Sequence, residues 1–315
     1  MLAAAVVGLL AAAPQADASY LLARNVGKVG LKVNRDGTMA MVTYYEPGHG
    51  WRHVLAWGAV NARQPNPTKP QIKFKLDYTG GWAKFGRPLY KTFRDHSRAY
   101  DGPALPWLVK AKKAPNGSYW AVQRWRRNLP CCGVKPWKWT QSAWELRLSH
   151  WTGAPAKLDI WLDWANHGSV HNLFGLMTWR GKPQYGFGSS SAGNPSDGYG
   201  RLVSVESYNS PLGDGWKHVL TFLTHRPLGN FCMAFYPRKQ PWWYPNPGAP
   251  TPRGNGERYR ATVPGPGVTP DVQWKGDGLP DFDPADPALV QHEDDMNALR
   301  ESQIAADPDD KCHYD

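Results

Sequence analysis

The sequence predicts an all-β protein: an antiparallel two-sheet sandwich or jelly roll with long loops, followed by an acidic, largely irregular C-terminal tail. Three observations support this fold class. Short runs alternate between apolar and polar residues, Gly and Pro separate these runs at close intervals, and no long helical pattern precedes residue 285. At 315 residues the chain can bury a full core as one large or two small domains.

The stretch from Trp144 to Phe187 shows the alternation most clearly. Between residues 157 and 164 the even positions are apolar, and the odd positions are Lys157, Asp159, Trp161 and Asp163. Successive side chains of a strand point to opposite faces, so these two sets lie on opposite sides of a sheet. Residues 144–151 alternate in the same way. Turn signals at 152–155 and 165–168 predict adjacent antiparallel strands whose odd-numbered side chains face outward together.

The rest of the chain contains further predicted strands between turns. In chain order they are 38–45, 51–60, 71–78, 107–111, 118–125, 201–207, 216–223, 230–236, 258–263 and 271–274. Residues 84–104 are basic and rich in turns, and they predict no definite element. Residues 19–275 therefore form the expected β-sandwich domain, with 19–110 as a candidate subdomain.

The first 18 residues have the features of a signal peptide. An apolar run, 2–13, precedes Ala16-Asp17-Ala18, which fits the small-x-small cleavage pattern, so the mature chain is expected to begin at Ser19. No Lys or Arg precedes the run, and a buried helix is the alternative interpretation. The run is too short for a bilayer span, which needs about 20 residues. We expect a secreted protein, extracellular or associated with the cell wall, with no membrane span.

Charge divides the chain into a basic body and an acidic tail. The net charge is +11, yet from Gly276 onward 12 acidic residues face only two basic ones. The body should therefore attract anionic polymers. Residues 276–315 are expected to be extended or disordered, with one short helix over 287–305. Gly276 to Asp281 resembles the end of a thrombospondin-type calcium repeat, but Gln273 and Lys275 stand where such a repeat needs Asp, so a solvated tail is the preferred interpretation and calcium the alternative.

Four cysteines fit an oxidising compartment. Adjacent cysteines rarely bridge each other, so each of Cys131 and Cys132 is expected to pair with Cys232 or Cys312, in an order that spacing leaves open. No Cys-x-x-Cys spacing predicts a metal site, no Gly-x-Ser-x-Gly motif predicts a serine hydrolase, and no glycine-rich nucleotide loop occurs. We expect no metal and no nucleic acid partner.

A pair of carboxylates is the candidate catalytic centre. If the turn at 152–156 joins paired strands, Glu145 lies opposite Asp163, and directly opposed Cβ atoms are about 4.5–5.5 Å apart. A retaining glycosidase holds its two carboxyl groups about 5–5.5 Å apart. Glu206 is a substitute partner. Candidate substrate-binding residues are Trp151, Trp161, Arg147, Asp159, Trp242 and Trp243. Alternatively, Arg147 and Lys157 neutralise the carboxylates on a sheet face with no catalytic role.

Two tripeptides carry a resemblance to a known family. Trp144-Glu145-Leu146 and Ile160-Trp161-Leu162, followed by Gly168, resemble the cleft hairpin of the endoglucanase jelly roll with concanavalin-like architecture. The resemblance spans about 40 residues and implies a jelly roll with a sugar-facing surface. The family's nucleophilic Glu falls at Lys157, and no second Glu is present near Phe231-Cys232-Met233, so the resemblance does not extend to that family's catalysis.

Three functions follow from these features. The first is binding of a polysaccharide or anionic wall polymer, because 17 tryptophans leave several for a surface where flat rings can stack on sugars. The second is a glycoside hydrolase that uses Glu145 and Asp163. The third is a structural envelope protein whose aromatic residues are all committed to packing.

Overall fold

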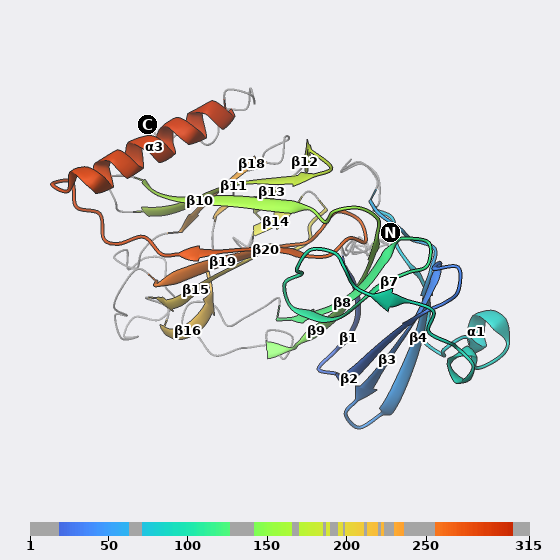
Figure 1. Ribbon diagram of the computed structural model, residues 1–315. Helices are drawn as coiled ribbons and strands as arrows, with labels where there is room; N and C mark the ends of the chain where they lie inside the picture. Colours follow the sequence, from blue (N-terminus) through green and yellow to red (C-terminus); the bar gives the residue numbers. More distant parts are fainter. Residues whose placement is uncertain are drawn as a thin grey trace, which may run out of the picture.

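The computed structural model describes the chain from Ser19 to Ile304 with gaps. The described ranges are 19–62, 71–126, 142–165, 170–184, 187–189, 195–197, 199–210, 213–219, 222–223, 230–235 and 256–304. These residues form antiparallel sheets with little helix, so the all-β prediction is confirmed. The expected pair of sheets is wrong in number, because four main sheets pack in two pairs (Figure 1).

Sheets A and B form the first sandwich. Sheet A has the order β1 (Tyr20–Arg24), β9 (Glu145–Trp151), β8 (Tyr119–Trp125), β7 (Leu108–Lys113) and β6 (Arg98–Ala99). Sheet B has the order β2 (Gly27–Val33), β3 (Met39–Glu46), β4 (Gly50–Trp57) and β5 (Lys75–Asp77). Their facing sides share one apolar core, which includes Val42, Val54, Trp120, Leu146 and Leu148.

Sheets C and D form the second sandwich. Sheet C has the order β16 (Gly213–His218), β15 (Ser204–Ser210), β19 (Arg258–Val263) and β20 (Val272–Asp277). Sheet D has the order β10 (Lys157–Ala165), β11 (Val170–Trp179), β18 (Asn230–Phe235) and β17 (Phe222–Leu223), with β12 (Lys182–Pro183) beside β11. A second core, with Ile160, Leu173, Val205 and Ala261, lies between them. A separate ribbon pairs β13 (Phe187–Ser189) with β14 (Pro195–Asp197).

The predicted pairing of residues 144–151 with 157–164 is wrong. β9 pairs with β1 and β8, whereas β10 pairs with β11 along its whole length. Residues 152–156 therefore carry the chain from one sandwich to the other. The alternation itself is correct, since Leu146 and Leu148 face the first core while Leu158 and Ile160 face the second. Alternation determines which face of a strand is apolar, but it does not determine the partner strand.

The loop between β19 and β20 joins the two sandwiches. Every residue from Tyr259 to Val272 is buried, although the stretch 264–270 reads Pro-Gly-Pro-Gly-Val-Thr-Pro. Loops usually run over the surface because buried backbone groups need partners. Here they have them: Val268 O accepts from His150 N at 2.8 Å, and Gly265 O accepts from Arg201 Nη1 at 3.1 Å. Val268 also belongs to the first core. The loop therefore acts as a buried connector between the sandwiches.

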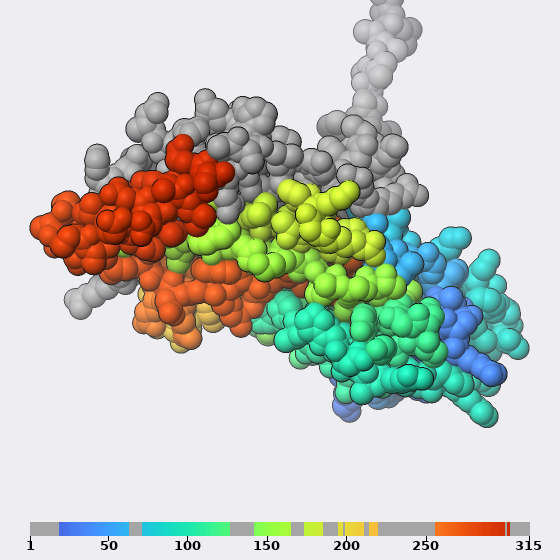
Figure 2. Space-filling view, turned by 45° about the horizontal axis from the view of Figure 1, so that its top comes forward, coloured from blue at the N-terminus to red at the C-terminus, as the bar shows by residue number. Residues whose placement is uncertain are grey.

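The tail is partly docked on the second sandwich. α3 (Pro287–Ile304) lies where a helix is predicted and covers the outer side of sheet D (Figures 1 and 2). Leu299 packs with Trp161 and Phe174, and His292 Nε2 lies 3.2 Å from Leu162 O. Trp164 Nε1 donates to Pro280 O at 3.1 Å. Within the described ranges, no helix combines the length and apolar character needed to cross a bilayer.

Candidate functional site

The three candidate catalytic carboxylates lie in three different sheets. Glu145 is on β9 in sheet A, Asp163 on β10 in sheet D, and Glu206 on β15 in sheet C. All three are buried. Because β9 and β10 do not pair, the predicted Glu145–Asp163 pair does not form. In the register of sheet D, Asp163 is opposite Asn172 instead.

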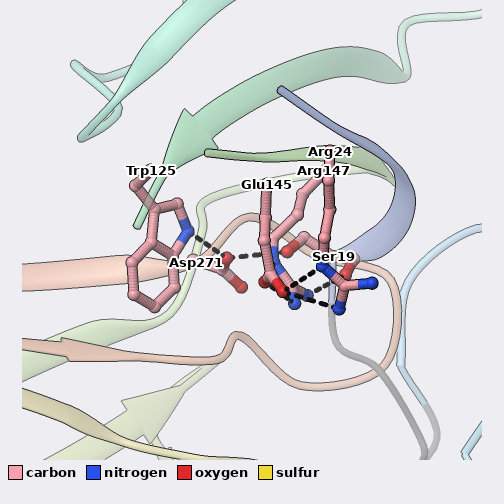
Figure 3. A network of polar contacts seen from close by, with 6 residues as sticks. All are labelled: Ser19, Arg24, Trp125, Glu145, Arg147 and Asp271. Carbon is pink, nitrogen blue, oxygen red and sulfur yellow. Dashed lines mark hydrogen bonds and ion pairs between the residues drawn. The ribbon is translucent and has the colours of Figure 1, made fainter. Parts of the chain in front are cut away.

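Glu145 belongs to a buried ionic network (Figure 3). Its Oε2 accepts from Arg147 Nε at 3.1 Å and Nη2 at 2.5 Å, and its Oε1 accepts from Arg24 Nη2 at 2.9 Å. Arg147 also donates to Ser19 O at 2.9 Å. Two guanidinium groups thus hold this carboxylate by charge-assisted hydrogen bonds. The neutralising role of Arg147, the alternative left open by the sequence, therefore describes this residue best.

The same network reaches the buried connector through Asp271. Asp271 Oδ2 accepts from Ser19 Oγ at 2.7 Å and from Trp125 Nε1 at 2.9 Å. Gln123 and the backbone of Asp271 exchange two hydrogen bonds, each of 3.0 Å. Figure 3 shows the labelled side chains converging on one another. They come from Ser19, β1, β8, β9 and the connector. This cluster therefore fastens the first sandwich to the connector.

Glu206 forms a second buried pair, with Arg260 on the neighbouring strand β19. The guanidinium of Arg260 lies 3.9 Å from the ring centre of Trp216 and 4.7 Å from that of Trp107. Burial lowers the pKa of Arg260 to about 10. Arg260 therefore lies against two indole rings while it neutralises Glu206, which is the arrangement of a buried structural ion pair.

The two candidate sugar platforms pack against neighbouring aromatic rings: Trp151 is buried and Trp161 partly buried. Trp151 is fully buried and packs against Tyr119, with ring centres 5.4 Å apart. Trp161 packs against Phe174 beneath α3. Asp159 is partly exposed, and its Oδ1 lies 2.9 Å from Lys157 Nζ. The stacking role predicted for Trp151 does not fit this structure, because its ring is buried against Tyr100 and Tyr119.

Several predicted residues lie outside the described ranges. These are Trp242, Trp243, Cys131, Cys132 and Cys312; Cys232 lies in β18, whose side chains are not described. Their predicted roles stay predictions. Among the described residues, no group of three or more His, Cys, Asp or Glu side chains is arranged to hold a metal ion. Residues 272–277, beside the calcium-like motif, form strand β20.

The exposed aromatic residues gather elsewhere, on the outer face of sheet B. We call residues 78–98, which cover this face, the cap segment. It contains α1 (Trp82–Phe85) and a 3₁₀ turn, η1 (Leu89–Lys91). Trp82 is 60% exposed and Phe85 43% exposed, and Trp51 on the adjoining β4 is 53% exposed. Figure 1 places α1 at the end of the molecule opposite α3.

Stacking holds the middle of the cap segment on β4. Odd-numbered residues of β4 point away from the core, since Val54 and Ala56 face it. The ring of Tyr90 stacks on His53 with centres 4.1 Å apart and planes 7° apart, and Phe85 lies 6.2 Å from Trp57. The aromatic row of β4 thus continues onto the cap segment.

Two aspartates anchor the ends of the cap segment. Asp77, at the end of β5, accepts from Thr79 N at 2.8 Å and Lys84 N at 3.0 Å. Burial favours its neutral form, but these hydrogen bonds outweigh burial and lower the pKa of Asp77. Asp95 Oδ1 accepts from Val33 N at 3.1 Å, and His96 N donates to Val33 O at 2.8 Å. The cap segment is therefore a fixed surface feature.

The cap segment is strongly basic. Its residues 78–98 contain one acidic side chain, Asp95, which is already engaged by the backbone of β2 and by Lys112 Nζ at 3.3 Å. Five basic side chains are exposed, and none makes an ion pair within the described ranges: Lys84, Arg87, Lys91, Arg94 and Arg98. Cations beside exposed indole and phenyl rings suit a ligand with both flat apolar faces and negative charge.

Sequence reasoning missed this surface. Residues 84–104 showed no periodicity, because α1 is a single turn closed by Gly81 and Gly86 in the left-handed conformation. The usable signal was compositional: Trp82 and Phe85 occur among basic residues between glycines, a context that disfavours core packing. Comparisons of the chain with protein-family models, curated proteins and solved structures find no match. The resemblance to the endoglucanase jelly roll therefore stays a prediction.

Proposed function

We propose that this protein is secreted and binds an anionic polysaccharide of the cell wall or its surroundings through the cap segment and the adjoining outer face of β4. The observation that carries the proposal is the exposure of Trp82, Phe85 and Trp51 on a surface with five exposed basic side chains. Exposed rings of this size cost solvation free energy, which a bound sugar ring would offset.

Charge and stacking make separable contributions. The basic residues steer a polyanion to the surface and respond to salt, whereas the rings bind the apolar faces of sugars and respond little to salt. Helix α3 of the acidic tail lies at the far end of the molecule from α1, so this described part of the tail leaves the cap segment open (Figure 1).

Binding to an immobilised uronate polymer tests the proposal. We expect the double variant Trp82→Ala/Phe85→Ala to bind at least about tenfold more weakly, which corresponds to about 1.4 kcal/mol. We expect Lys84→Ala/Arg87→Ala to weaken binding at low salt and to reduce its salt dependence.

Trp144→Ala is the matched control. Trp144 is also exposed, at 37%, and lies beside Arg124 and Arg126, but it directly precedes β9 of sheet A and is not part of the cap segment. Equal loss in the control and in the Trp82→Ala/Phe85→Ala variant would contradict the proposal, as would unchanged binding in both.

A further inference from the structure

The residue at the predicted cleavage junction is built into the core of the protein. Ser19 is fully buried, its hydroxyl donates to Asp271 Oδ2, and its carbonyl oxygen accepts from Arg147 (Figure 3). Chain termini usually lie at the surface. A new terminus at Ser19 would instead start inside the network that fastens the first sandwich to the connector.

Asp271 has an unused acceptor in this network. Oδ2 accepts two hydrogen bonds, but Oδ1 is buried and has no hydrogen-bond partner among the described residues. A buried carboxylate oxygen without a donor costs free energy, and buried carboxylates are normally paired with a positive charge. Arg147 and Arg24 both direct their guanidinium groups to Glu145. Within the described part of the chain, Asp271 Oδ1 therefore receives no hydrogen bond from a cationic group.

We propose that removal of residues 1–18 creates this donor: the α-ammonium group of Ser19 forms a buried ion pair with Asp271. Hydrolysis of the Ala18–Ser19 peptide bond by a leader peptidase consumes one water, leaves a carboxylate on Ala18 and frees the amino group of Ser19. An α-amino group has an ordinary pKa of about 7.7–8.0, so it is mostly protonated at neutral pH.

Covalent geometry keeps the new ammonium group close to Asp271. The hydroxyl oxygen of Ser19 is already 2.7 Å from Asp271 Oδ2, and the nitrogen of the same residue is separated from that oxygen only by the α and β carbons. An ammonium group has three donors in place of one, so it can reach Oδ1 while the hydroxyl keeps Oδ2. Because Ser19 is buried in the folded chain, cleavage precedes folding, and the mature chain folds around its own terminus.

Periodate tests the burial directly, since it oxidises an N-terminal serine only when the amino and hydroxyl groups are both accessible. For the secreted protein, whose mass must correspond to a start at Ser19, we expect oxidation at least about tenfold slower in the native state than in urea. A different start, or equal rates in both states, would overturn the proposal.

A thermodynamic cycle tests the ion pair. The mature chain is compared with a chain that keeps Asp17 and Ala18 ahead of Ser19, each with and without Asp271→Asn. We expect the substitution to lower the melting temperature of the mature chain by about 5 °C, and that of the extended chain by clearly less. Equal losses would show that Asp271 acts only through Ser19 Oγ and Trp125, and would overturn the pairing.

The periodate comparison requires no variant, so it decides the matter even if Asp271→Asn fails to fold. The proposal rests on the predicted leader cleavage and not on polymer binding. Neither readout involves the cap segment, so failure here and failure of the binding proposal are distinguishable.

Discussion

Replacing Glu145 with Gln tests the assignment of this residue to the structural network. Arg147 is 1% exposed at its side chain and donates twice to Glu145 Oε2, and Arg24 donates to Oε1. The substitution keeps the shape but removes the negative charge between two guanidinium groups. Breaking a buried pair by removing one partner costs about 3–5 kcal/mol. We take the lower end, about 3 kcal/mol, because Arg24 is partly exposed and can turn to solvent.

Urea denaturation followed by circular dichroism measures this cost. Glu46→Gln is the matched control, because Glu46 Oε2 lies 2.8 Å from Arg52 Nε on the surface. The Glu46 side chain is 35% exposed and that of Arg52 is 44% exposed. Such a surface pair contributes about 0–1 kcal/mol. A destabilisation by Glu145→Gln as small as that of Glu46→Gln would refute the structural role of the network.

Three further predictions concern pH, the connector and the cap segment. Burial lowers the pKa of both His150 and His218 to about 4, so between about pH 6.5 and 4 the unfolded chain binds protons that the folded chain does not. The free energy of unfolding, measured in urea, should therefore fall as pH falls through this window, by up to about 1.4 kcal/mol per pH unit for each histidine. A free energy of unfolding that stays constant over this pH range would contradict the prediction. Gly267→Ala should destabilise the protein by about 2 kcal/mol or more, because φ is +61° and the new Cβ would lie 2.6 Å from Ala62 Cα. Gly200→Ala, where φ is +71° and the space is open, should cost only about 1 kcal/mol. Similar urea-unfolding midpoints for the two variants would be inconsistent with a tightly packed connector. Asp77→Asn should release the start of the cap segment, so trypsin should cleave after Lys84 about tenfold faster than in the wild type. Unchanged cleavage would show that Asp77 is not the anchor.

The sequence predicted the local structure better than the assembly. Residues 258–263 are predicted as a strand and form β19 with the same bounds, and the faces of β10 follow the predicted alternation. The partner strand of β9 could not be predicted from the sequence, because residues 119–125 and 157–165 are equally good strands and the turn at 152–156 looks like a hairpin turn. The strand that pairs with β9 is determined by how the two cores pack against the connector. That packing depends on contacts between residues distant in sequence.

The candidate site failed for a related reason. An indole ring is as suitable for a core as for a sugar platform, so composition cannot separate Trp151, which is buried, from Trp82, which is exposed. The position of Arg147, two residues from Glu145 on the same face of β9, was more informative than the tryptophans. It indicated that Glu145 has a cationic partner that neutralises it. For the cap segment, exposure follows from a one-turn helix that lies outside the sheet, a feature with no periodicity to detect.

Oxidative footprinting of the tryptophans, with and without a bound uronate polymer, shows which exposed indole rings the polymer covers. We expect the polymer to slow oxidation of Trp82 and Trp51 and to leave Trp144 unchanged. Protection of Trp144 instead, or no protection of Trp82 under conditions where the polymer is bound, would contradict it.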